Sequence, residues 1–154
     1  MDIERILNRM SQAGTPDELL AYVSLHHQTG CRISDLLAID YKCITAQLNI
    51  SILQGKGSQP LTVQPIRYRE FWKKVYELRL SPMAIYNRFF FYRLYKKYGI
   101  QYNKRKGKNS FVTHAFRKNL ADDIYKIDNN KQRVQSALGH RSNRSTEHYT
   151  DNDR

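Results

Sequence analysis

The spacing of apolar residues changes in the middle of the chain, and this change limits the folds that the chain can adopt. Apolar side chains alternate with polar ones in two short runs, Leu48, Ile50, Ile52 and Leu61, Val63, Pro65. The sequence Gly55-Lys56-Gly57-Ser58 lies between the two runs. Alternation on both sides of a glycine-rich turn predicts a β-hairpin, here with Lys56 at its tip. We therefore expect one small antiparallel sheet.

Helices are predicted before this hairpin. Thr15 has the position of an N-cap, Pro16 that of a first helical residue, and Glu18 completes a capping box. The helix that they begin should end near Gly30. Apolar residues then recur at helical spacing, namely Ile33, Leu36 and Leu37. A second helix is therefore expected to open at Arg32.

The signals become helical again after the hairpin. Three helices are predicted: one from Ser81-Pro82 to Gly99, one capped by Thr113 and starting near His114, and one from about Asn130 to Gly139. Helices with one small antiparallel sheet make the expected fold class mainly α (α+β). A length of 154 residues suits a single domain over residues 1–154.

The chain is strongly basic, with 26 Lys and Arg against 14 Asp and Glu and a net charge of +12. Such a charge attracts polyanions, of which nucleic acid is the commonest large one, while a membrane surface or an acidic protein stays open on charge alone. No acidic residue lies between Glu77 and Asp122. The cations predicted to contact DNA fall in this stretch: Arg88, Arg93, Lys96, Lys97, Lys104, Arg105, Lys106 and Lys108.

Tyrosines are interleaved with these cations, at Tyr86, Tyr92, Tyr95, Tyr98 and Tyr102. Their phenol groups can bond phosphate oxygens or pack inside the domain. The alternative to a DNA-contacting surface is a solvated helix face over a tyrosine-rich core.

Several classes of protein lose support from the sequence. The longest apolar run, Phe89–Tyr92, is far shorter than the ~20 residues that span a bilayer. The N-terminus lacks a basic stretch followed by an apolar one, so we expect a cytoplasmic setting. Cys31 and Cys43 form neither a disulfide framework nor a metal motif and are expected to be buried free thiols. Gly55-Lys56 lacks the earlier glycine of a nucleotide-binding loop, so no cofactor is expected.

Five segments form an ordered set along the chain: Thr29 to Leu36 with Arg32, Lys56 in the hairpin turn, His114-Ala115-Phe116-Arg117, Leu138-Gly139-His140, and Tyr149. The spacings are 24 residues from Arg32 to Lys56, three from His114 to Arg117, 23 to His140 and nine to Tyr149. Each segment alone is common, but the order and spacing of the whole set are specific. In the order and spacing of these segments, the chain resembles the catalytic domain of the tyrosine recombinases, also called phage-type integrases.

The resemblance implies that Tyr149 is the nucleophile that attacks a DNA phosphodiester and becomes joined to the 3′ phosphate. Attack builds negative charge on the nonbridging oxygens, which fixed cations must stabilise when no metal is used. Arginine stays protonated and offers paired donors that match phosphate, so Arg32 and Arg117 are expected to clamp the scissile phosphate. A tyrosine hydroxyl is mostly protonated at neutral pH and needs activation.

The remaining members of the set are assigned supporting roles by the same resemblance. His114 lies one helical turn before Arg117 and is expected to act as a general base or proton relay. His140 would bond the phosphate or position the tyrosine, and Lys56 would protonate the departing 5′ oxygen. Asp35, where the family more often has glutamate, would support the architecture of the site.

The expected partner is double-stranded DNA, bound by four protomers at synapsed sites in a prokaryotic, phage or mobile-element context; the protein alone can be a monomer. Only about 30 residues precede Arg32 and five follow Tyr149. We therefore expect no N-terminal DNA-clamping domain in this chain, which is a minimal recombinase or a fragment of a longer one. Two alternatives remain: DNA relaxation of the type IB topoisomerase kind, and a non-catalytic DNA-binding or regulatory relic.

Overall fold

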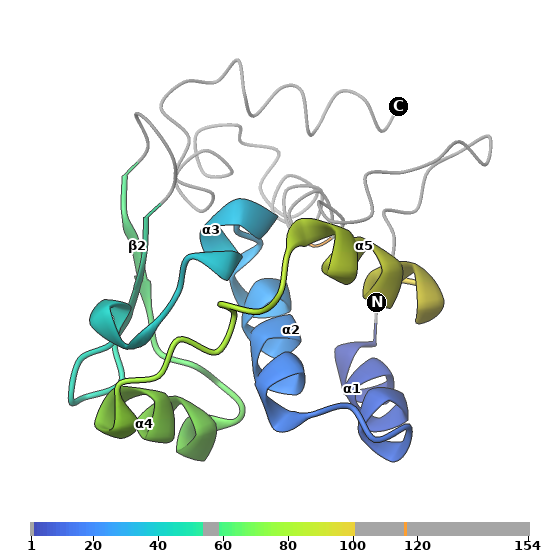
Figure 1. The fold of residues 1–154 in the computed structure, drawn as a ribbon, viewed down its shortest axis with the longest axis horizontal. Coiled ribbons are helices and arrows are strands. Elements are labelled where there is room, and N and C mark those ends of the chain that lie inside the picture. The colour runs from blue at the N-terminus through green and yellow to red at the C-terminus, as the bar shows by residue number, and fades with distance from the viewer. Residues whose placement is uncertain (1, 54–58, 101–115, 117–154) are drawn as a thin grey trace, which may run out of the picture.

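The computed structural model describes residues 2–53, 59–100 and 116 of the chain. Helices predominate, and one antiparallel pair of strands lies beside them (Figure 1). The elements in order are α1 (Ile3–Gln12), α2 (Asp17–Thr29), α3 (Ile33–Leu37), the 3-10 helix η1 (Tyr41–Cys43), β1 (Ile50–Ile52), β2 (Leu61–Val63), α4 (Arg69–Leu78) and α5 (Arg88–Lys97). This arrangement confirms the predicted mainly α, α+β class.

Helix α2 lies at the centre of the described residues. It packs against α1, α3 and α4 (Figure 1). Every residue from Leu19 to His26 is buried, so the helix is covered on all sides. The Tyr22 ring packs against Trp72 of α4 at 4.9 Å between ring centroids, and the Tyr22 hydroxyl donates to the Ile39 carbonyl at 2.5 Å. The core of the domain is therefore built around α2.

The predicted end of α2 is confirmed, but its predicted N-cap is wrong. Gly30 follows the helix with φ of 64°, a left-handed conformation that glycine adopts without steric cost. At the other end Pro16, not Thr15, is the N-cap residue, and no side chain caps the helix. The Thr15 backbone N–H donates instead to the Met10 carbonyl at 3.0 Å, because Thr15 belongs to the turn that closes α1.

The predicted hairpin is confirmed over its strands. Ile50 pairs with Val63 and Ile52 with Leu61 in an antiparallel register. Ile50 and Ile52 are fully buried, so the alternation that predicted β1 places its apolar side chains in the core. The turn that contains Lys56 lies outside the described residues.

The helix predicted from Ser81-Pro82 begins later than expected. Residues 81–86 form turns, and α5 starts only after Asn87, whose side chain accepts a hydrogen bond from the Phe90 N–H at 2.9 Å. Asparagine is a strong N-cap residue, and this cap sets the start. The predicted stop is confirmed, since Gly99 follows the helix with φ of 70°. The helices expected near His114 and Asn130 lie outside the described residues, apart from Phe116, which is helical.

The two cysteines differ in their surroundings. Cys31 is fully buried, as predicted, whereas Cys43 is only partly buried, which corrects the expectation that both are buried. Cys43 belongs to η1, a short 3-10 helix in which no residue is buried. Neither of these two described cysteines forms a disulfide bond.

Candidate functional site

Arg32 stands at the N-terminus of α3 on a backbone that is held on both sides. The preceding residue, Cys31, accepts a hydrogen bond from the His26 ring at its carbonyl, 2.8 Å away, and donates its N–H to the Thr29 hydroxyl at 3.3 Å. The Arg32 carbonyl accepts from the Leu36 N–H at 3.0 Å as α3 begins. The peptide that carries the Arg32 side chain is therefore fixed, which confirms the prediction that a helix opens there.

The Arg32 side chain is half-buried and has no polar partner among the described residues. Within the described ranges, its guanidinium makes neither a hydrogen bond nor an ion pair. A half-buried cation interacts more strongly with an anion than one surrounded by water does. The arrangement therefore suits the binding of a phosphate group by paired guanidinium donors.

Asp35 is placed three residues after Arg32 in the same short helix and is also half-buried. Residues three apart are neighbours on a helix surface. The predicted supporting role of Asp35 is compatible with this position and remains a prediction.

The predicted DNA-contacting cations of α5 all lie on its exposed side, at Arg88, Arg93, Lys96 and Lys97. Phe91 and Tyr95 on the other side of the helix are fully buried. The helix therefore has a solvated cationic face over an aromatic core, as the alternative interpretation of this stretch expects, and contact of these cations with DNA remains a prediction. Lys96 and Lys97 also lie in the last turn, where positive charge interacts favourably with the helix dipole.

The interleaved tyrosines divide between the core and the surface. Tyr95 and Tyr98 are buried, Tyr86 is half-buried, and Tyr92 is 40% exposed. The Lys96 ammonium lies 5.7 Å from the centroid of the Tyr92 ring. Among the tyrosines of α5, Tyr92 is therefore the one whose hydroxyl can reach a ligand from outside.

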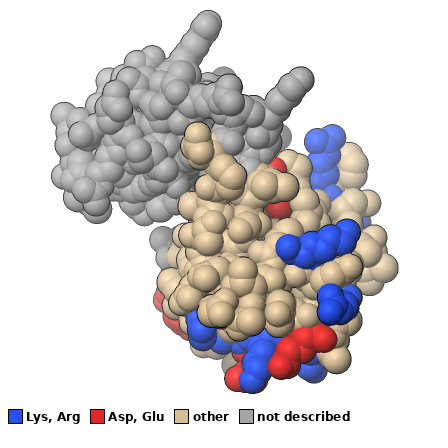
Figure 2. All heavy atoms as spheres, turned by 90° about the vertical axis from the view of Figure 1, so that its left-hand side faces the viewer, with Lys and Arg blue, Asp and Glu red and all other residues tan. Residues whose placement is uncertain are grey.

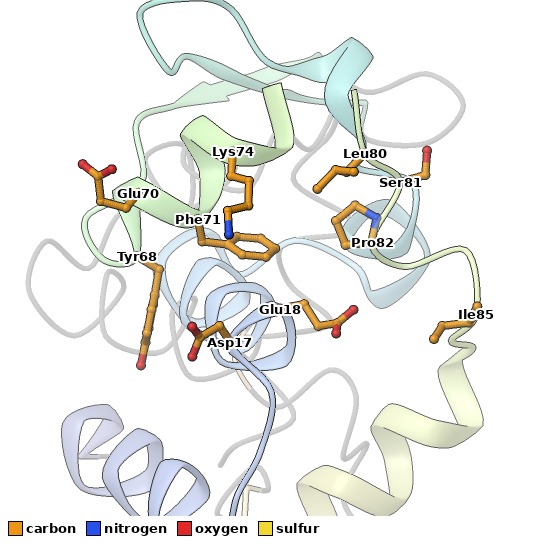
Figure 3. A pocket seen from close by; sticks show the side chains of 10 residues that line it. All are labelled: Asp17, Glu18, Tyr68, Glu70, Phe71, Lys74, Leu80, Ser81, Pro82 and Ile85. Atoms are coloured by element: carbon orange, nitrogen blue, oxygen red, sulfur yellow. The ribbon is translucent and has the colours of Figure 1, made fainter. Parts of the chain in front are cut away.

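A pocket of about 640 Å³ opens between the start of α2, helix α4 and the turns that precede α5. Figure 3 shows Asp17 and Glu18 on the α2 side of it and Phe71 and Lys74 on the α4 side. Glu70 completes the charged lining, so three carboxylates stand against one ammonium group. This excess of negative charge disfavours the binding of a phosphate, so we do not assign the pocket to DNA binding.

The face that carries the hairpin and α4 has a mixed charge. In Figure 2 its Lys and Arg side chains follow one side and the lower edge, where acidic groups lie next to them, and they border a broad uncharged area. The exposed cations of α5, together with Arg32, are therefore better candidates for contacts with DNA than the cations of this face are.

Most of the predicted site lies outside the described residues. This applies to the proposed catalytic residues Lys56, His114, Arg117, His140 and Tyr149. It applies also to four predicted DNA contacts, Lys104, Arg105, Lys106 and Lys108. Within the described ranges, no group of three or more His, Cys, Asp or Glu residues is arranged to hold a metal ion. In those ranges, no helix has the length and apolarity needed to cross a membrane.

Reasoning from the sequence overlooked His26, which bonds the backbone next to Arg32. Its signal was a histidine that continues the apolar run beginning at Leu19, six residues before the arginine. It also overlooked Phe116, which is 2% exposed and packs against the His26 and His27 rings at 5.1 and 5.4 Å between centroids. Phe116 lies between His114 and Arg117 in the sequence.

Solved structures with a similar fold include recombinases. XerH bound to its difH substrate in a pre-cleavage complex has a TM-score of 0.63 at 20% identity, covering 96% of this chain and 48% of that chain. XerA has a TM-score of 0.63 at 21% identity, covering 96% and 57%. A post-cleavage complex of XerH with palindromic difH has a TM-score of 0.64 at 21% identity, covering 99% and 48%.

The chain spans about half the length of these recombinases. No curated protein sequence matches it significantly. At this level of identity the structures establish the fold, and membership of a family rests on the sequence itself. The profile of the phage integrase family matches residues 1–154, and the chain therefore belongs to the phage integrase family of tyrosine recombinases.

Proposed function

We propose that this protein is a site-specific DNA recombinase that cleaves and rejoins strands through a 3′-phosphotyrosyl intermediate on Tyr149. The observation that carries the proposal is Arg32, in the motif Thr29-Gly30-Cys31-Arg32, on a backbone fixed by hydrogen bonds and with a guanidinium that has no partner among the described residues. Arginine presented in this way favours binding of an anion. The family match over the whole chain makes DNA phosphate the anion of choice.

In the proposed reaction, the Tyr149 oxygen forms a bond to phosphorus and the bond from phosphorus to the 5′ oxygen breaks. The tyrosine proton passes to His114 or His140, and Lys56 supplies a proton to the departing 5′ oxygen. Arg32 and Arg117 stabilise the charge on the nonbridging oxygens. The phosphotyrosyl bond keeps the energy of the phosphodiester, so a 5′ hydroxyl from another strand can reseal it without a cofactor.

The proposed partner is double-stranded DNA. The XerH structures are complexes with difH, which supports DNA as the ligand of this chain too. We further propose that four protomers act at synapsed sites, with Asp35 supporting the site, and that the reaction takes place in the cytoplasm.

Trapping of a covalent complex tests the proposal. Purified protein is mixed with nicked duplexes from its own genomic neighbourhood, and the products are separated in SDS after the nicked strand has diffused away. An SDS-resistant adduct attached at Tyr149 is expected, and joining of two duplexes would exclude simple relaxation. If binding occurs without any adduct, the protein is instead a DNA-binding relic.

The cations of α5 should contribute salt-dependent affinity for DNA. Lys96→Ala and Lys97→Ala each remove one exposed ammonium group. Each phosphate contact contributes ~0.9 to the slope of log K against log salt concentration, so each variant should lower that slope by about one. Fluorescence anisotropy over a series of salt concentrations measures it. Lys73→Ala on α4 also removes an exposed charge and serves as the control. Equal slopes for all variants would contradict the assignment.

Lys56→Ala should slow the cleavage of ordinary DNA by on the order of 10²-fold, because general acid catalysis typically contributes 10²- to 10⁴-fold. A substrate with sulfur in place of the bridging 5′ oxygen should restore the rate, since a thiolate leaves without that proton. Single-turnover adduct formation on both substrates measures the effect.

The control for Lys56 is Arg32→Ala, whose loss of charge stabilisation a better leaving group does not repair. Equal rescue of both variants, or of neither, would remove Lys56 from the general acid role. Lys108 or another lysine of the basic stretch would then become the candidate.

A further inference from the structure

His26 links three parts of the fold that are separate in the sequence. It is fully buried in α2. Its Nδ1 lies 2.7 Å from the Tyr95 hydroxyl of α5, and its Nε2 lies 2.8 Å from the Cys31 carbonyl oxygen. One imidazole therefore connects α2, α5 and the peptide that immediately precedes Arg32.

The partners of His26 determine the direction of these hydrogen bonds. A carbonyl oxygen only accepts, so Nε2 carries the hydrogen and donates it to Cys31. In a neutral ring with this tautomer, Nδ1 accepts from the Tyr95 hydroxyl. Burial raises the pKa of Tyr95 well above its usual value, so this hydroxyl keeps the proton that it donates. The chain of donors runs from Tyr95 through His26 to the backbone beside Arg32.

Aromatic packing also brings Phe116 against the same cluster. Phe116 lies edge-on to the His26 ring at 5.1 Å and to the Tyr95 ring at 5.4 Å between centroids. Phe116 immediately precedes Arg117 in the sequence.

We infer that His26, held by Tyr95, is a positioning residue that fixes the Cys31 carbonyl and through it the direction in which Arg32 approaches the scissile phosphate. The inference rests on the proposed function. Both His26 and Tyr95 are fully buried, so in this role they act on Arg32 from inside the fold and not through contact with DNA. A small misplacement of a catalytic group is enough to slow a reaction by orders of magnitude.

Tyr95→Phe is the sharpest test, because it removes one hydroxyl and keeps the ring that packs against Phe91 and Phe116. Single-turnover adduct formation at saturating DNA should fall by between about 10-fold and 100-fold, with the Kd for DNA unchanged. His26→Leu should lower the rate of adduct formation at least as much. His26→Gln should recover part of the loss, because an amide offers both the donor and the acceptor that this position requires.

Tyr22→Phe is the matched control. Like Tyr95→Phe, it removes the hydroxyl of a buried tyrosine. The hydroxyl of Tyr22 donates to the Ile39 carbonyl, and this bond does not involve the Arg32 turn. Thermal unfolding of both tyrosine variants separates stability from rate. Tyr22→Phe should lower the melting temperature and leave the rate of adduct formation unchanged, whereas Tyr95→Phe should lower the rate at temperatures where the protein is fully folded.

A double-mutant cycle tests whether the effect passes through Arg32. If it does, Tyr95→Phe should have little further effect in an Arg32→Ala background, since the group being positioned is already gone. An equal slowing in both backgrounds, or a wild-type rate for folded Tyr95→Phe, would overturn the inference while leaving the proposed function intact. Absence of any adduct from the wild-type protein would overturn both.

Discussion

Replacement of Tyr149 by phenylalanine is expected to abolish the covalent adduct and leave DNA affinity nearly unchanged. The variant lacks only the oxygen that would bond to phosphorus, while the basic surface that binds DNA remains. The measurement is adduct formation on nicked duplexes in SDS gels, together with anisotropy binding at the same salt concentration. Cleavage should fall below detection, because phenylalanine has no oxygen that could form the bond to phosphorus.

Tyr125→Phe provides a suitable control, since it removes a different tyrosine hydroxyl from the last third of the chain. It should form the adduct at the wild-type rate. An adduct that persists in Tyr149→Phe would contradict the assignment of Tyr149 as the nucleophile. Mapping of the attached peptide would then identify the residue that carries the DNA.

Replacement of Arg32 by alanine should lower the rate of cleavage by on the order of 10²-fold or more, because loss of one preorganised donor to a developing oxyanion typically costs that much. The structure adds a reason specific to this residue. Its backbone is held by hydrogen bonds at Cys31 and by the first turn of α3, so the point from which the side chain extends is fixed before DNA binds. Single-turnover rates at saturating DNA measure the effect.

Two variants separate this effect from a general loss of charge. Arg5→Ala removes an exposed cation of α1 and should leave the rate at saturating DNA unchanged. Arg32→Lys keeps the positive charge without the paired donors and should recover only part of the activity. Near-wild-type cleavage by Arg32→Ala would contradict the role of the arginine as a phosphate clamp.

Local patterns in the sequence predicted the parts of the fold in which neighbouring residues decide the conformation. The strands of the hairpin follow from alternation, and the ends of α2 and α5 follow from Gly30 and Gly99, each with positive φ. The opening of α3 at Arg32 was predicted in the same way. In each case the signal and the structure lie within a few residues of each other.

Elements whose starts depend on competing local bonds were predicted less well. The N-cap of α2 moved from Thr15 to Pro16 because the Thr15 N–H bonds to Met10 of the preceding helix. The start of α5 moved to Arg88 because the Asn87 side chain caps the helix there, whereas the residues after Ser81 form turns. Helices α1 and α4 were not predicted, and α4 follows Tyr68, which has positive φ and gives no side-chain cap.

The sequence alone determined the helical class with its hairpin, the basic character and the ordered residues that identify the family. Only the tertiary structure decided which polar groups support Arg32. His26 reads in the sequence as part of an apolar helix, yet it joins the Cys31 carbonyl to Tyr95, a residue 69 positions away. The physical reason is that a buried polar group must find a hydrogen-bond partner, and that partner is set by the packing of α2 against its neighbours rather than by adjacent residues.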